Sequence, residues 1–178
     1  MTSERRLESL LARLRNRALA EGLRRDTMLL LCLQEALLAR LAVSEHRDRF
    51  VLKGGLNLYS RYGGAARPTR DIDLAWSGLP NTVEVVLEAL RAVAAIKLDD
   101  SVAFDLESLA GAPINEGAAH GGVRVELDAR VEAAVERLVL DVSFGNAITP
   151  GPRHPRVPVP AREGAAPAAG LPAGDHRG

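Results

Sequence analysis

Hydrophobic residues recur along the first forty positions with the spacing of helices. Leucines and alanines repeat every three or four residues over 4–20 and over 26–41, which places them on one face of each segment. Ser3 and Asp26 can cap the two helices, and Gly22 can end the first. The pattern predicts an N-terminal helical hairpin, which we expect to cover a sheet formed by the later residues.

Strand-like segments dominate the chain after residue 47. Short apolar or alternating runs predict strands at 50–52, 71–74, 102–106, 112–115, 123–131 and 137–144. Apolar residues with the helical period predict a long helix at 82–96, and a shorter helix is expected at 56–62. The last two strands, separated by a turn at 132–136, are expected to form a hairpin. The sequence therefore predicts an α/β fold built on a mixed sheet.

Composition narrows the class of protein. The 178 residues are 47% hydrophobic, which is enough for one domain with a substantial core. The 23 basic and 23 acidic residues balance, so the net charge indicates no partner, and an aromatic content of 3% disfavours a base-stacking surface. The single cysteine, Cys32, excludes an internal disulfide and a cysteine-cluster metal site. With no signal peptide or membrane span apparent, we expect a cytoplasmic protein without a membrane partner.

Two aspartates and a glycine pair carry the candidate chemistry. Asp71 and Asp73 are two residues apart on a predicted strand, so their side chains lie on the same face. Paired carboxylates repel each other unless a cation lies between them, and such oxygen ligands suit Mg²⁺ together with substrate phosphates. Gly54 and Gly55 precede a helix, where exposed backbone N–H groups can cradle phosphates. A phosphate site joined to a metal site suggests nucleotidyl transfer.

These motifs resemble a known family. The run L-K-G-G at 52–55, followed by R-P-T-R-D-I-D-L at 67–74 and L-D-V-S-F-G at 140–145, is similar to the nucleotidyltransferase toxins of the AbiEii/AbiGii family. That family belongs to the DNA polymerase β-like superfamily, in which a glycine turn precedes a D-x-D pair. The resemblance covers roughly residues 5–152.

The resemblance implies a reaction, its partners and further site residues. Family members are toxins of toxin–antitoxin pairs, and some add nucleotides to tRNA ends. The expected cofactor is therefore Mg²⁺, and the expected partners are an NTP, an RNA acceptor and a cognate antitoxin. In the superfamily a third carboxylate on a neighbouring strand completes the metal site, and Asp141 is the candidate here. Lys53, Thr69 and Arg70 are candidates for nucleotide contacts beside the glycine pair.

The end of the chain departs from the family pattern. We expect a helical hairpin at 1–46, a nucleotidyltransferase core at 47–152 and a disordered tail at 153–178, since the tail is rich in proline, glycine and alanine. The family's later A-E-K-L and K-D-x-x-D-L motifs are absent. Synonymous codons for 156–178, read one base later, give a peptide similar to the Y-P-x-L-L and Y-P-R-E-T segments of the family. The tail is therefore hypothesised to be out of frame, which would leave the chain truncated.

Two other functions compete with an active toxin. A catalytically inactive remnant would keep the fold and bind at most nucleotide or antitoxin. A helix-turn-helix DNA reader is disfavoured, because arginines are spread over both N-terminal helices without an obvious recognition helix.

Overall fold

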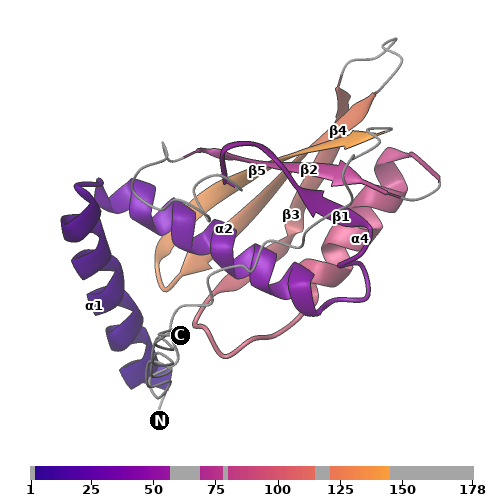
Figure 1. The fold of residues 1–178 in the computed structure, drawn as a ribbon. Helices are drawn as coiled ribbons and strands as arrows, with labels where there is room; N and C mark the ends of the chain where they lie inside the picture. The colour runs from indigo at the N-terminus through magenta and orange to yellow at the C-terminus, as the bar shows by residue number, and fades with distance from the viewer. Residues whose placement is uncertain (1–2, 57–68, 78–79, 115–120, 145–178) are drawn as a thin grey trace, which may run out of the picture.

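The fold, seen in a computed structural model, is a five-stranded mixed sheet with helices packed on one face (Figure 1). The structure describes residues 3–56, 69–77, 80–114 and 121–144. The loop expected at 63–68, the tail at 153–178 and most of the helix expected at 56–62 lie outside these residues.

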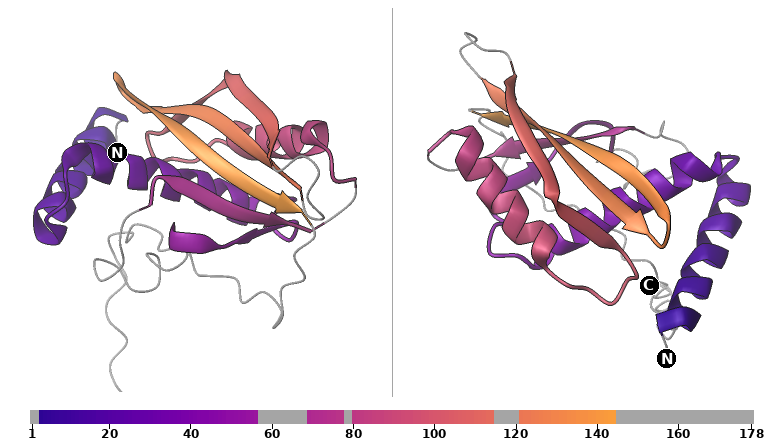
Figure 2. Two further views of the ribbon diagram at one scale, coloured as in Figure 1. Left: turned by 90° about the horizontal axis from the view of Figure 1, so that it is seen from above. Right: turned by 180° about the vertical axis from the view of Figure 1, so that it is seen from behind.

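All three long helices predicted from the sequence are present: α1 (Ser3–Glu21), α2 (Arg25–Val43) and α4 (Val83–Ala95). Thr82 caps the start of α4, since its Oγ1 accepts a hydrogen bond from the backbone N–H of Val85. Of the two N-terminal helices, α2 lies on the sheet, whereas α1 packs against α2 and extends away from the strands (Figures 1 and 2). No helix among the described residues is long and apolar enough to cross a membrane.

The five strands follow an order that differs from their order in the sequence. They are β1 (Phe50–Leu52), β2 (Asp71–Trp76), β3 (Ala103–Ile114), β4 (Gly122–Val131) and β5 (Ala134–Phe144). Their spatial order is β1-β2-β5-β4-β3, and only the β2–β5 pair is parallel. The α/β class with a mixed sheet is therefore confirmed, and the parallel pair brings two distant parts of the chain together.

The prediction of two short strands between 102 and 115 is wrong, because β3 is one strand with an irregularity. Asp105 pairs with Asp128 and Ala110 pairs with Glu126, so five steps along β3 correspond to two along β4. The hydroxyl of Ser108 accepts a hydrogen bond from the N–H of Asp128 at 2.9 Å, which satisfies a group that the interrupted ladder leaves unpaired.

The hairpin predicted from the last two strands is confirmed, but its turn is shorter than predicted. β4 and β5 pair up to Val131 opposite Ala134, so residues 132–133 alone form the turn. Glu132 adopts a positive φ of 53°, which two-residue hairpin turns require and which glycine or asparagine usually supplies. Without either residue the sequence carries no signal for so tight a turn.

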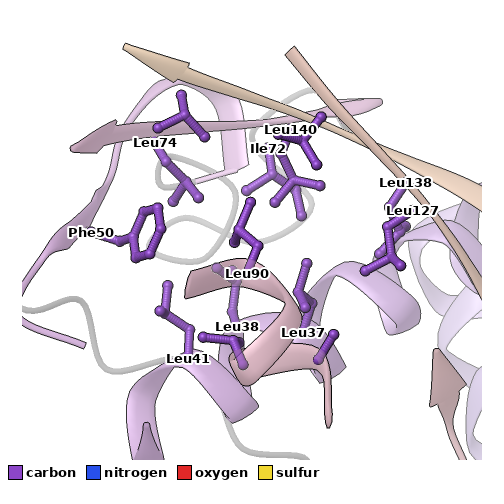
Figure 3. Packing of buried hydrophobic residues seen from close by; sticks show 14 of the residues in the cluster. Leu37, Leu38, Leu41, Phe50, Ile72, Leu74, Leu90, Leu127, Leu138 and Leu140 are labelled. Atoms are coloured by element: carbon purple, nitrogen blue, oxygen red, sulfur yellow. The ribbon is translucent and has the colours of Figure 1, made fainter. Parts of the chain in front are cut away.

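The hydrophobic core lies between the sheet and helices α2 and α4 (Figure 3). Alternate residues of the central strands point into it and are fully buried, among them Ile72 and Leu74 of β2 and Leu138 and Leu140 of β5. The intervening residues lie on the opposite face. This alternation places Asp71 and Asp73 of β2, together with Arg137 and Asp141 of β5, on the face that the helices leave open.

One buried charge anchors α2 to the segment before β3. The guanidinium of Arg40, 2% exposed, donates hydrogen bonds of 2.6 and 3.0 Å to the carboxylate of Asp100. It also donates to the carbonyl oxygens of Ala36, Ile96 and Val102. A buried cation with this many partners is stable, and it fixes α2 relative to the sheet.

Candidate functional site

The candidate site is built on the open face of β2. Asp71 and Asp73 are half-buried on this face, while Ile72 and Leu74 between and beyond them are fully buried on the other. The two carboxylates therefore project from the same side of the strand, as the sequence predicts.

The parallel pairing of β2 with β5 brings Asp141 to the same place. Asp141 lies directly opposite Asp73 in the register of the two strands, with Val142 paired to Leu74 beside them. Neighbouring strands are about 4.8 Å apart, so residues in register on one face are close neighbours. All three predicted acids, Asp71, Asp73 and Asp141, therefore lie on one face of two adjacent strands.

The proximity of these acids affects the ionisation of Asp73. Partial burial, followed by the negative charges of Asp141 and Asp71, raises the pKa of the Asp73 carboxyl above its ordinary value. The positive charge of Lys53 acts in the opposite direction. A divalent cation would remove this repulsion, and so the donor set fits a Mg²⁺ ion in its chemistry.

The glycine pair packs directly against these side chains. Gly54 has a φ of +61°, and a Cβ atom placed on it would lie 1.9 Å from Oδ2 of Asp73. A Cβ atom on Gly55 would lie 3.2 Å from Cβ of Thr69. The backbone N–H of Lys53 donates a 2.8 Å hydrogen bond to the carbonyl of Asp73, which fixes the approach of the two segments. Residues 54–56 are already helical, so the pair stands at the start of a helical turn.

Lys53 is held over the site by the strand that carries Asp141. Its Nζ donates a 3.2 Å hydrogen bond to Oγ of Ser143, and this hydroxyl donates in turn to the carbonyl of Leu74 at 3.2 Å. Ser143 is two residues from Asp141 and lies on the same face of β5. The structure thus brings Lys53 together with the three acids.

Gln34 of α2 positions the residues that lead into β2, and it was not singled out from the sequence. Its side chain is fully buried, and Nε2 donates hydrogen bonds to the carbonyls of Arg70 at 2.9 Å and Thr69 at 3.4 Å. The hydroxyl of Thr69 then donates to the carbonyl of Asp71 at 3.2 Å. Thr69 lies beside Gly55, since a Cβ atom placed on that glycine would lie 3.2 Å from Cβ of Thr69. The side chain of Arg70 is exposed.

Arg124 of β4 is a second residue that sequence reasoning missed. It lies opposite Asp141, and its Nε and Nη2 donate hydrogen bonds of 2.8 and 2.7 Å to the two carboxylate oxygens. This pairing raises the pKa of the guanidinium, so Arg124 stays charged.

Across residues 3–56, 69–77, 80–114 and 121–144, no three histidine, cysteine, aspartate or glutamate side chains are arranged to hold a metal ion.

Two solved structures and one family model are similar to this chain. No curated protein matches the chain. A crystal structure of a Helicobacter pylori protein assigned as a nucleotidyltransferase is similar at 20% identity and a TM-score of 0.45, over 72% of this chain and 49% of that one. The crystal structure of JHP933 from Helicobacter pylori is similar at 20% identity and a TM-score of 0.41, over 66% and 44% of the two chains.

The chain thus spans about half the length of these two proteins. A family model described as nucleotidyl transferase AbiEii toxin, type IV toxin–antitoxin system, matches residues 36–173. The match includes residues 36–43 of α2, helix α4, all five strands and part of the segment predicted to be a tail. The chain therefore belongs to the AbiEii family of nucleotidyl transferase toxins.

Proposed function

We propose that this chain binds an NTP with Mg²⁺ and transfers its nucleoside monophosphate to an acceptor hydroxyl. The observation that carries the proposal is the meeting of Asp71, Asp73 and Asp141 on one open sheet face, with Gly54 packed against Asp73. Carboxylates this close together repel one another unless a cation lies between them. The glycine turn beside them leaves room for phosphates.

The residues divide into three roles in this reaction. Asp71 and Asp73 would hold the ion, which when bound neutralises charge on the triphosphate and on the departing pyrophosphate. The N–H groups of Gly54 and Gly55, assisted by Lys53, Thr69 and Arg70, would bind the phosphate oxygens.

Asp141 would act on the acceptor. The acceptor oxygen forms a bond to the α-phosphorus, the bond from that phosphorus to the bridging oxygen breaks, and pyrophosphate leaves with the electron pair. The proton of the acceptor hydroxyl passes to the Asp141 carboxylate, or Asp141 contributes to holding a second ion. In either role Asp141 would use oxygens that accept hydrogen bonds from Arg124 in this structure.

The family indicates the biological setting of this reaction. A type IV toxin implies a cognate antitoxin, and we propose that one counteracts this protein. An RNA acceptor, such as a tRNA end, is the acceptor class that the resemblance to transferase toxins favours.

A second candidate function is binding without turnover. The observation that favours it is the pairing of Asp141 with Arg124 through both carboxylate oxygens, together with the lack of a three-ligand metal group among the residues that the structure describes. Such a protein would still bind nucleotide or antitoxin through the same fold.

The two candidates are separated by measuring ligand binding and turnover on the same protein. Mg²⁺ with each of the four NTPs should raise the melting temperature, since a ligand that binds only the native state stabilises it. The double variant Asp71→Ala/Asp73→Ala should lose this response. The matched control Glu126→Ala/Asp128→Ala, on the same sheet face, should keep it.

Turnover is then tested with radiolabelled NTPs and total tRNA. Labelled RNA that depends on Asp141 supports the transferase, and a thermal response without any label supports the binding function. An unchanged thermal response in the Asp71→Ala/Asp73→Ala variant would contradict the site itself.

A further inference from the structure

Arg124 makes a two-point ion pair with Asp141 on the open face of the sheet. Its planar guanidinium faces both oxygens of Asp141 at 2.8 and 2.7 Å, a two-point geometry that adds specificity to the charge attraction. The negative charge of Asp71 also stabilises its positive charge. Arg124 therefore belongs to the electrostatics of the site, although neither the sequence pattern nor the proposed reaction assigns it a role.

The partners of this pair differ in their freedom to move. The Arg124 side chain is 50% exposed, whereas that of Asp141 is 23% exposed and lies between Asp73 and Arg124 in neighbouring strands. Arg124 can swing into solvent on its long stem, while Asp141 can only turn between its two neighbours. If Asp141 changes partner, Arg124 is therefore the side chain that moves away.

We propose that Arg124 competes with the divalent cation for Asp141 and so limits metal binding when no nucleotide is present. The inference rests on the proposed function, because it assumes that a cation binds at Asp71 and Asp73. A guanidinium that pairs with both oxygens of Asp141 engages one lone pair of each and holds a positive charge beside them, which disfavours a second cation there. If the metal displaces the guanidinium to reach Asp141, the affinity for metal falls by the strength of the lost pair.

Nucleotide would relieve this competition. The fork of a guanidinium suits phosphate oxygens as well as it suits a carboxylate, so an NTP offers Arg124 a replacement partner. Metal and NTP are then expected to bind with positive coupling: each raises the affinity for the other. Without an NTP the affinity of the site for metal stays low. Arg124 acts in this account as a positioning residue through Asp141.

The chain offers a matched control for the loss of the charge. Arg137 of β5 donates hydrogen bonds of 2.7 and 3.1 Å to both oxygens of Asp128 on the same open face. The register places this pair four residues along the strands from Arg124 and Asp141, or about 13 Å at the usual rise per residue. Arg137→Gln removes the same charge and the same kind of pair without touching the site.

Calorimetric titration with Mn²⁺ alone, on metal-free protein, tests the proposal. Arg124→Gln should bind Mn²⁺ about fivefold to tenfold more tightly than the wild type, a range typical of one lost charge-assisted competitor. Arg137→Gln should change the affinity by less than about twofold, because its charge is screened over that distance. The gain should vanish in Arg124→Gln/Asp141→Asn, where the contested carboxylate is gone.

A second measurement follows the Arg124 side chain of the wild-type protein directly. The Nε–H resonance of Arg124, assigned by its absence from the spectrum of Arg124→Gln, should shift when diamagnetic Mg²⁺ is added, because its acceptor on Asp141 is lost. An unshifted resonance at saturating Mg²⁺ overturns the proposal.

The outcomes distinguish this inference from the proposed function. Equal Mn²⁺ affinities in Arg124→Gln and Arg137→Gln, together with weakened binding in Asp73→Asn, overturn the role of Arg124 and leave the metal site standing. Mn²⁺ binding that is unaffected by Asp73→Asn in every background overturns both.

Discussion

Replacing Gly54 with alanine tests the contact between the glycine turn and the metal-binding strand. The added Cβ atom would lie 1.9 Å from Oδ2, 2.7 Å from Cγ and 3.0 Å from Cβ of Asp73. Rotation of the Asp73 side chain can move Oδ2 and Cγ, but its Cβ is fixed to β2. The turn and the strand must therefore separate, and the carboxylate must leave its present position.

The magnitude follows from a comparison with Gly22, which ends α1. Gly22 has a φ of +64°, and a Cβ atom placed on it would meet nothing within 4 Å. Gly22→Ala thus carries only the strain of a left-handed residue, about 1–2 kcal/mol. Gly54→Ala carries the same strain, since its φ is +61°, and an overpacking penalty of about 1–3 kcal/mol in addition. The expected losses in free energy of unfolding are therefore about 1–2 and about 2–5 kcal/mol.

Urea denaturation, followed by circular dichroism, measures both losses, and the rise in melting temperature with Mg²⁺ and NTP measures the site. Gly22→Ala should keep the ligand response, whereas Gly54→Ala should lose it. In Gly54→Ala/Asp73→Ala the clashing carboxylate is absent, so part of the lost stability should return. If the Gly54 and Gly22 variants lose equal stability, or if Asp73→Ala restores none, the reasoning about this contact is wrong.

Two further predictions follow from the site. Because the pKa of Asp73 is raised in the folded state, its ionised form opposes folding above the ordinary aspartate pKa of about 3.9. Asp73→Asn should therefore raise the melting temperature at pH 7 and leave it nearly unchanged at about pH 3; an equal gain at both would contradict this. Gln34→Met leaves the Arg70 carbonyl without its 2.9 Å donor, so unfolding in urea should show a loss of about 1–3 kcal/mol, and unchanged stability would refute the positioning role.

The sequence by itself determined the elements and the chemistry that each one carries. The helical period identified α1, α2 and α4, and alternation in D-I-D-L placed Asp71 and Asp73 on one face of a strand. Gly54 and Gly55 were identified as two adjacent glycines directly before a predicted helix. These features depend on residues a few positions apart, and local spacing fixes their geometry before any tertiary contact forms.

Only the tertiary structure decided that Asp141 lies beside Asp73 on the neighbouring strand. The parallel pairing of β2 and β5 brings together Asp73 and Asp141, although the residues between them form a helix and two further strands. From the residues alone, Asp141 was an acid among hydrophobic neighbours, and its place beside Asp73 rested on resemblance to the family.

The length of the turn between β4 and β5 decides which residue of β4 lies opposite Asp141. The turn predicted at 132–136 would place Leu127 opposite Asp141, whereas the observed turn at 132–133 places Arg124 there. A hairpin's register follows from its turn length, and here Glu132 adopts the positive φ that the pattern assigns to glycine or asparagine. The packing of both strands on the core outweighs the strain at that one residue, and that balance is a property of the whole fold and not of the local sequence.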